Sequence, residues 1–333
     1  MVKNGHGIFS EFPHGSLYLK GRDVCILVGF ARRSNPSPAL KKYCELLAAN
    51  GFVVFVGLNV IDPDPDLARK ELPDAAFVFL QYNAGFDFGL WSEVLKANAD
   101  LFQANSITLL NDSTIPLSPV KLTKTMDAVK AATADVVALT DNYRPLHHFQ
   151  SYFFTFKSTA LRHKNVQRFW RNLEICDTKE EVIEKYECKL LENLNAWGLT
   201  TEILFSHKVL FPEISNERFK ELKKMMGSPL LLMGDKLIAT GLPMIKAALF
   251  FDARYDFSIY HLRFDSLNEH YDMATIKEHV AYLTQENTLG RTFNHKLRYR
   301  FMSMILGKKQ VSRVFHKNHA RLQARARKNL RQL

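Results

Sequence analysis

The chain has 333 residues, of which 47% are hydrophobic and 12% aromatic, so it can bury one large core or two modest ones. Its formal net charge of +11 arises at one end. Residues 287–333 hold 13 Lys and Arg and no acidic residue, whereas the rest carries 32 basic and 34 acidic residues. The composition excludes a wholly disordered chain. A secretory signal peptide and a transmembrane helix are not expected, because residues 1–20 and the most apolar later stretch, 229–251, are interrupted by charged residues and prolines.

Apolar segments alternate with helix-like segments through the first 140 residues. In the first helix, Ser37 suits the N-cap, Pro38 the first position and Gly51 the end. In chain order the predicted strands are 24–30, 52–56, 75–80, 106–110 and 134–139, and the predicted helices are 38 to near 51, 88–98 and 119–130. This rhythm predicts an α/β fold with a mostly parallel sheet flanked by helices.

The second half of the chain has a different pattern. An aromatic strand is predicted first, then two helices, a further helix and strand, and an amphipathic basic helix, at 150–156, 159–173, 179–197, 216–226, 257–264 and 297–315. We therefore expect a first domain over 1–205, a C-terminal helical region over 206–285 and a basic amphipathic tail over 286–333.

The sequence lacks the motifs of several common protein classes. The four cysteines form no Cys-x-x-Cys pair and no zinc spacing, which predicts reduced core thiols in a cytosolic protein. There is neither the G-x-G-x-x-G of a Rossmann dehydrogenase nor a Walker A motif.

Polar residues follow two of the predicted strands. Asn83-x-Gly85-x-Asp87-x-Gly89 comes after the third strand, and Asn111-Asp112-Ser113 ends the fourth, which we expect to be its neighbour in the sheet. Ligands of open α/β sheets bind at the carboxyl ends of strands, where a carboxylate can hold a divalent cation against a diphosphate. Asp87 is equally typical of a helix cap, and Asn-Asp-Ser of a turn.

Two further groups could carry chemistry. His147 and His148 are adjacent, so in extended chain their side chains diverge, and one of them could contact a phosphate or a sugar hydroxyl. Glu187 borders the apolar face of the helix predicted over 179–197, where shielding would favour a general base. The alternatives are a loop histidine without a role and a surface glutamate paired with Lys185 or Lys189.

Taken in order, these motifs resemble the rhamnan synthesis protein F family, bacterial glycosyltransferases of surface polysaccharide assembly. The resemblance covers about residues 24–200, with an echo at 243–246. The residues that carry it are Asn83-x-Gly85-x-Asp87-x-Gly89-x-Trp91, Leu109-Leu-Asn111-Asp112-Ser113, Asp135 with Leu139-Thr140-Asp141, His148-x-Gln150-Ser151-Tyr152-Phe153, Phe169-Trp170 and Tyr186-Glu187.

The resemblance implies a GT-A-like nucleotide-sugar transferase, with the nucleotide-sugar and catalytic parts in residues 1–205 and the acceptor side in 206–285. Asn111-Asp112-Ser113 occupies the place of the Asp-x-Asp metal motif but begins with Asn. Asp112 would hold Mg²⁺ or Mn²⁺, and Glu187 would be the base of an inverting reaction. The remaining nucleotide-sugar-binding residues would be Asn83, Gly85, Asp87, Asn111, His148 and Gln150. The family link makes dTDP-rhamnose the first donor to consider.

The implied partners are a nucleotide-sugar donor and a lipid-linked glycan acceptor. The basic tail would attach the protein to an anionic membrane surface, at the inner face of the cytoplasmic membrane. One alternative is a non-catalytic glycan- or nucleotide-binding module with the same fold. Another is a nucleic-acid-binding protein that uses the tail, which is disfavoured because the body has neither a zinc finger nor an RNA-binding aromatic motif.

Overall fold

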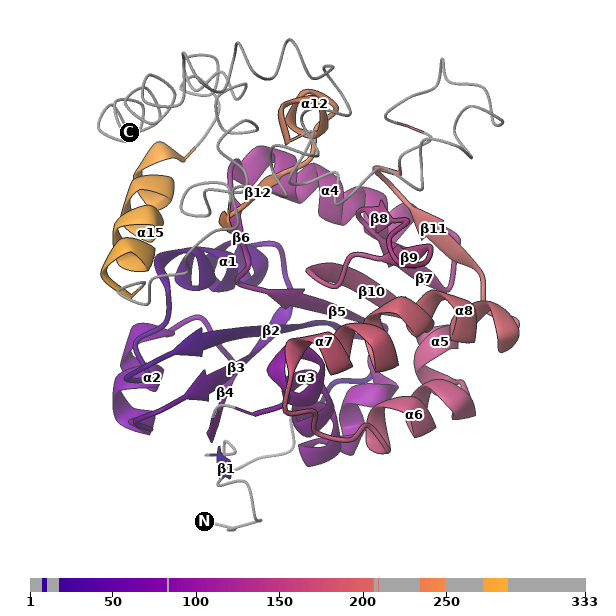
Figure 1. Ribbon diagram of the computed structural model, residues 1–333, viewed down its shortest axis with the longest axis horizontal. Helices are drawn as coiled ribbons and strands as arrows, with labels where there is room; N and C mark the ends of the chain where they lie inside the picture. The colour runs from indigo at the N-terminus through magenta and orange to yellow at the C-terminus, as the bar shows by residue number, and fades with distance from the viewer. Residues whose placement is uncertain are drawn as a thin grey trace, which may run out of the picture.

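An eight-stranded sheet with helices on both faces organises the protein (Figure 1). The computed structural model describes residues 8–10, 18–82, 84–206, 209, 234–248 and 272–286. The strand order is β1-β4-β3-β2-β5-β10-β7-β11. The strands are β1 Ile8–Ser10, β2 Asp23–Ala31, β3 Val53–Val60, β4 Phe77–Tyr82, β5 Ser106–Asn111, β7 Val136–Ala138, β10 Phe153–Lys157 and β11 Thr201–Ile203.

Most of the sheet is parallel. β4, β3, β2 and β5 run parallel to one another, and β11 runs parallel to β7. β10 is antiparallel to both β5 and β7, and β1 is antiparallel to β4. The predicted α/β arrangement, a mostly parallel sheet flanked by helices, is therefore confirmed, while the antiparallel insertion of β10 was not foreseen.

Three of the flanking helices begin with the same local device. α1 Pro38–Ala49, α2 Pro65–Glu71 and α4 Pro119–Ala131 each have Pro in the first turn and a side-chain N-cap, from Ser37, Asp64 and Ser118 respectively. Each cap accepts a hydrogen bond from a backbone N–H that would otherwise lack a partner, and the fixed φ of Pro suits the first helical turn. α1 ends at Ala49 with Asn50 as its C-cap, and the next residue, Gly51, has a φ of +82°, in the left-handed region that favours glycine.

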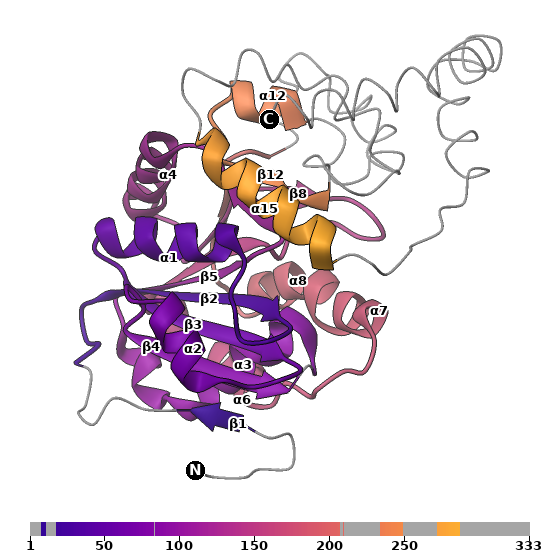
Figure 2. The same cartoon turned by 90° about the vertical axis from the view of Figure 1, so that its left-hand side faces the viewer.

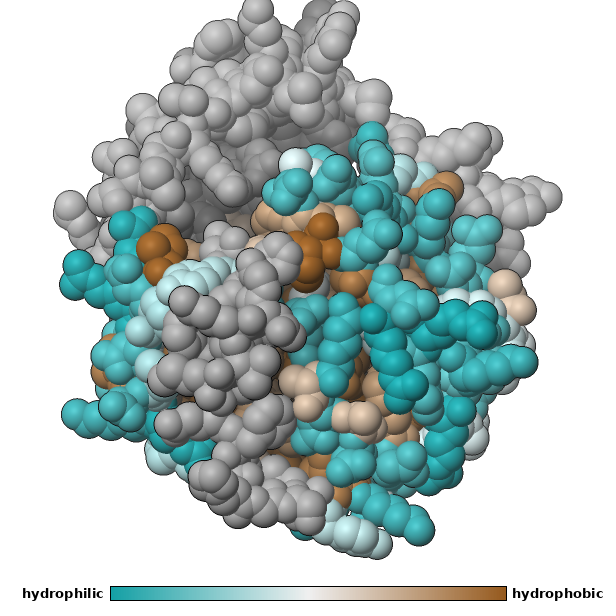
Figure 3. Space-filling view, turned by 90° about the horizontal axis from the view of Figure 1, so that it is seen from below, coloured by the Kyte–Doolittle hydropathy of each residue, from teal (hydrophilic) through white to brown (hydrophobic). Residues whose placement is uncertain are grey.

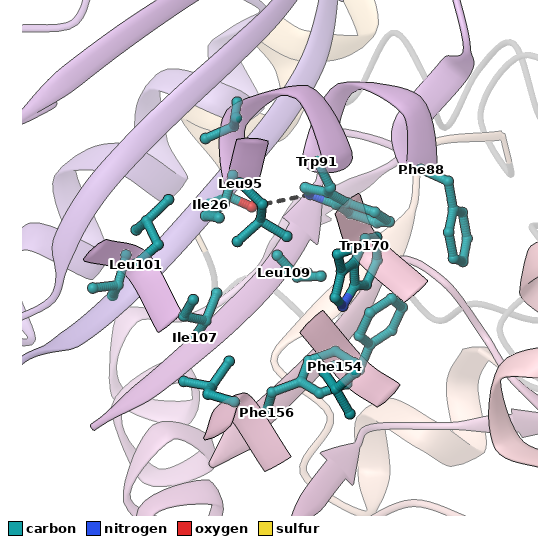
Figure 4. Close-up of a cluster of buried hydrophobic side chains, with 14 of the residues drawn as sticks. Ile26, Phe88, Trp91, Leu95, Leu101, Ile107, Leu109, Phe154, Phe156 and Trp170 are labelled. Atoms are coloured by element: carbon teal, nitrogen blue, oxygen red, sulfur yellow. Dashed lines mark hydrogen bonds between the residues drawn. The ribbon is translucent and has the colours of Figure 1, made fainter. Parts of the chain in front are cut away.

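α3, Phe86–Ala97, packs across the opposite face of the sheet from α1 and α4 (Figure 2). Figure 4 shows its Phe88 and Trp91 among the buried aromatic rings of Phe154 and Trp170. Trp91 Nε1 donates to the carbonyl oxygen of Ile26 on β2 at 3.2 Å, so the indole has a polar partner inside the core. This packing fixes α3 across β2 and β3.

The helices that follow β10 are more broken than the sequence predicts. The expected helix 159–173 is two helices, α5 Ser158–Arg162 and α6 Lys164–Arg171, separated at His163. The expected helix 179–197 is α7 Lys179–Val182, a π-helical turn η2 Ile183–Glu187, and α8 Cys188–Ala196. A short 3₁₀ helix, η1 Ala99–Gln103, follows α3, and the hairpin β8 Asp141–Asn142 with β9 His148–Phe149 precedes β10.

Two C-terminal segments return to the first part of the chain. β12 Met244–Lys246 follows α12 Gly234–Ala239 and pairs antiparallel with β6 Thr114–Pro116. α15, Met273–Glu286, packs beside α1, where the Ala39 backbone N–H donates to His279 Nδ1 at 3.3 Å. The predicted elements at 216–226, 257–264 and 297–315, and the basic tail, lie outside the described residues.

The described surface is mostly hydrophilic in the view of Figure 3, with apolar side chains in separate areas. The large exposed hydrophobic residues come from distant positions, among them Tyr18, Ile61, Val120 and Leu146. None of the helices within the described ranges is both long and apolar enough to cross a membrane. All four cysteines are buried and unpaired, as the sequence predicts.

The buried His279 should make folding sensitive to acid. Burial lowers its pKa from 6.5 to about 4, so the folded protein holds this imidazole neutral. Above pH 6.5 this group does not change the free energy of unfolding. As the pH falls from 6.5 toward 4, protonation of His279 in the unfolded state lowers the free energy of unfolding by up to roughly 3 kcal/mol. We expect His279→Asn, which retains an acceptor for Ala39, to lose less unfolding free energy than the wild type between pH 7 and 5 in urea titrations. Parallel losses in both proteins would contradict this role.

Candidate active site

The two motifs that follow strands meet through a side-chain hydrogen bond. Asn111 Nδ2 donates to Asp87 Oδ2 at 2.7 Å. β4 and β5 were expected to be neighbours in the sheet, but β3 and β2 lie between them. α3 makes the contact possible, since it leaves the end of β4 and crosses the face of β3 and β2 toward β5.

An unusual backbone turn places Asp87. Gly85 and Phe86 have φ angles of +70° and +53°, both in the left-handed region. A Cβ added to Gly85 would lie 2.9 Å from Ile175 Cδ1 and 3.1 Å from Gly89 Cα, so a side chain at Gly85 would crowd both neighbours. Asp87 does not occupy the N-cap of α3, contrary to the capping alternative; Gly85 does, without a side-chain hydrogen bond. A strained turn at such a place is typical of functional sites.

Asp112 occupies a space left by a glycine. Its backbone N–H donates to the Val28 carbonyl oxygen at 3.0 Å, which keeps it beside the end of β2. A Cβ added to Gly29 would lie 2.5 Å from both Asp112 Oδ2 and Leu40 Cδ1. Gly29 is therefore required for the carboxylate to lie where it does. The sequence analysis missed this residue, although a glycine inside a strand signals close approach of another group.

The two carboxylates destabilise each other's charge. Burial raises the pKa of Asp112 to about 7, with Asp87 adding to the rise, while the Phe30 backbone and the Ser37 hydroxyl oppose it. Burial also raises the pKa of Asp87, whereas the positive charges of Lys179 and Lys246 oppose this rise. Carboxylates perturbed by burial and by a specific charged partner are typical of binding or catalytic sites.

A lysine from the C-terminal strand β12 completes this cluster. Lys246 Nζ donates to Ser113 Oγ at 2.6 Å, and the Ser113 hydroxyl donates to Asn111 Oδ1. Burial, with help from Lys179, lowers the pKa of Lys246 to about 8, while Asp87 and other carboxylates oppose the shift. In the sequence this lysine belongs only to the family echo at 243–246, and it was not among the predicted site residues.

Glu187 faces inward at the end of the π-helical turn. Its Oε1 accepts from the Ser151 backbone N–H at 3.2 Å and lies 3.9 Å from His148 Nε2, and its side chain is 17% exposed. Within the described residues no ion pair joins it to Lys185 or Lys189, so the alternative of a paired surface glutamate is not what the structure shows. π-helical turns are frequent at functional sites.

The two adjacent histidines diverge as predicted. His148 Nδ1 donates to the Leu146 carbonyl oxygen at 2.7 Å, which leaves Nε2 directed toward Glu187. His147 Nε2 lies 3.0 Å from Asp141 Oδ2 instead. His148 thus lies beside the candidate base and His147 does not.

The two remaining predicted site residues are Gln150 and Asn83. The Gln150 side chain accepts a hydrogen bond from the Thr140 hydroxyl at 2.8 Å and is buried, so it links the two segments that flank the β8–β9 hairpin. Asn83 lies outside the described residues.

The acidic residues suit a diphosphate-bound cation. Within the described ranges no group of three or more His, Cys, Asp or Glu side chains is arranged to hold a metal by itself. Mg²⁺ on a nucleotide needs only one or two carboxylates, because phosphate oxygens and water complete its coordination. Asp112 and Asp87 supply two such carboxylates whose mutual repulsion a cation would relieve.

The fold and this cluster define an α/β protein with a cluster of carboxylates at the carboxyl ends of its parallel strands. The chain belongs to the rhamnan synthesis protein F family, whose model matches residues 66–324.

Known proteins show distant similarity to the chain. An uncharacterised protein of Sinorhizobium fredii is 22% identical over 212 residues, which are 61% of this chain and about half, 54%, of that protein. The glycosyltransferase GlyE of Streptococcus pneumoniae has a TM-score of 0.38 and 10% identity, over 82% of this chain and 67% of that one. A mannosyltransferase of Pyrobaculum calidifontis, solved with GDP-Man and Mn²⁺, has a TM-score of 0.35 and 11% identity, over 95% and 90%.

Asp112→Asn should stabilise the protein at pH 8 when no divalent cation is present. The folded pKa of about 7 lies above the unfolded value, so the ionised carboxylate costs stability as the pH rises through 7. We expect a gain of about 1–2 kcal/mol in urea unfolding, allowing for partial exposure of the group. Millimolar Mn²⁺ or Mg²⁺ should stabilise the wild type and not the variant.

The exposed Asp127→Asn on α4 is the matched control, and it should change neither property. A wild type that gains no stability from either cation would count against Asp112 as a metal ligand. A variant less stable than the wild type at pH 8 would show that the carboxylate is needed for the fold.

Proposed function

We propose that this protein transfers a sugar from a nucleotide diphosphate donor to a hydroxyl of a growing glycan, in the synthesis of a bacterial surface polysaccharide such as O-antigen, capsule or rhamnan. The observation that carries the proposal is the cluster around Asp112 and Asp87. It joins two repelling carboxylates and a lysine at the ligand-binding edge of the sheet, with an inward-facing glutamate beyond them. Family membership supports the same activity.

On the donor side, Asp112 with Asp87 would hold Mg²⁺ or Mn²⁺. When bound, the cation offsets negative charge on the diphosphate leaving group. Gly85 lets the backbone turn close to the nucleotide, and Asn111 keeps the Asp87 carboxylate in place through its 2.7 Å hydrogen bond. Rhamnose is the sugar we propose first, carried on dTDP, because the family is named for rhamnan synthesis.

On the acceptor side, Glu187 would take the proton of the attacking hydroxyl. The acceptor oxygen then bonds to the anomeric carbon of the sugar as the bond from that carbon to the diphosphate breaks, which inverts the configuration. The Ser151 N–H and His148 hold the carboxylate in one orientation, so its free oxygen can accept the proton.

Glu187→Gln should reduce transfer by about 10² to 10⁴ while donor binding changes little, because the amide cannot accept the proton. The measurement is transfer of labelled sugar from a panel of nucleotide sugars, beside isothermal titration with the donor that the wild type uses. Glu192→Gln, an exposed position on α8, is the matched control and should keep full activity.

Near-normal transfer by Glu187→Gln would remove Glu187 as the base. A wild type that binds a nucleotide sugar without transferring or hydrolysing it would instead assign the protein as a binding module of the same fold.

We further propose that the acceptor is carried on a lipid and that the basic residues of 287–333 attach the protein to the inner face of the cytoplasmic membrane. Removal of residues from Lys308 onward should weaken sedimentation with anionic vesicles, since each Lys or Arg near such a surface contributes about 1 kcal/mol. Raised salt should weaken binding of the full chain as well. Equal binding by both proteins, or by neither, would contradict the membrane role.

A further inference from the structure

The chain brings Lys246 to the carboxylates from far along the sequence. β12 pairs with β6, which places Lys246 opposite Thr114. The Ala247 N–H donates to the Ser113 carbonyl oxygen at 3.0 Å, so the pairing reaches the turn that carries Asp112. The backbone of Lys246 is therefore fixed relative to Asp112.

The Lys246 ammonium is held by neutral groups. Nζ donates to Ser113 Oγ at 2.6 Å and lies 5.8 Å from the centroid of the Tyr152 ring. Among the described residues no carboxylate oxygen lies within the 4.0 Å of an ion pair with it, although Asp87, Glu187 and Asp112 act on it at longer range. With one N–H given to Ser113, the ammonium has two more N–H groups to donate.

A second cation acts on the same groups. Lys179, the first residue of α7, has an electrostatic effect on both Lys246 and Asp87. The two lysines come from different parts of the chain, and Lys179 disfavours the charged form of Lys246. A multiply charged anion bound at Lys246 would offset this repulsion.

We propose that Lys246 binds a phosphate oxygen of the donor diphosphate and offsets its charge during transfer. When the bond from the anomeric carbon to the diphosphate breaks, the electron pair stays on the diphosphate oxygen, and the fixed ammonium stabilises that added charge. This role rests on the proposed function, because it assumes a nucleotide diphosphate in the site. It makes β12 part of the donor site and supplies positive charge in addition to any metal ion.

Isothermal titration of the full chain with dTDP, UDP and GDP tests this role, both with Mg²⁺ and with excess chelator. Lys246→Gln removes the charge and can keep a hydrogen bond to Ser113. We expect it to weaken diphosphate binding about 10- to 100-fold in both conditions. Lys246→Arg should stay within a few-fold of the wild type. Lys124→Met, at an exposed position on α4, is the control for loss of one positive charge.

The controls separate this proposal from the proposed function. Lys246→Met serves as a second neutral variant beside Lys246→Gln. Whichever of the two has the melting curve of a folded protein is sufficient for the test. Wild-type affinity for a diphosphate in a folded neutral variant overturns the role of Lys246 and leaves the proposed function intact. Failure of the wild type to bind all three diphosphates overturns both. The nucleosides thymidine, uridine and guanosine, which lack phosphates, should bind wild type and variant equally. If the variant loses as much affinity for the nucleosides as for the diphosphates, a phosphate-specific role of Lys246 is overturned.

Discussion

The hydrogen bond from Asn111 to Asp87 is the interaction on which the rest of the site depends. It joins the end of β5 to the first turn of α3. α3 follows β4, which is separated from β5 in the sheet by β3 and β2. An aspartate at position 111 would repel Asp87 and Asp112 at once. With Asn111 the second carboxylate of the cluster comes from Asp87 instead. The amide also binds Ser113, which in turn binds Lys246.

Local sequence signals predicted the elements well because their causes are local. Apolar runs marked β2, β3 and β5, and the Ser37-Pro38 pair marked the start of α1, since caps and fixed φ angles act within one turn. The order of strands is decided by pairing between distant segments, so the antiparallel β10 between β5 and β7 could not be read from periodicity. The split at His163 follows from a side chain that caps the next helix, a signal that is weak in sequence.

The same distinction applies to the site. Asp87, Asn111, Asp112 and Glu187 were identified as candidates because each follows a strand or borders an apolar face. Lys246 was missed because it reaches the site through a strand pair formed across 130 residues, which no spacing rule reveals. Gly29 was missed because its contribution is the absence of a side chain beside Asp112. Both roles become visible only when distances between segments are known.

The π-helical turn at 183–187 has a consequence for how this site could have arisen. A π turn holds one residue more than an α turn, and each residue of an α-helix advances by about 100° around its axis. One extra residue in an ordinary helix would therefore swing every following side chain by more than a quarter of a circle, whereas a π turn absorbs that residue within itself. A single-codon insertion is thus sufficient, in this geometry, to turn Glu187 toward Ser151 and His148 while the helices on either side keep their faces.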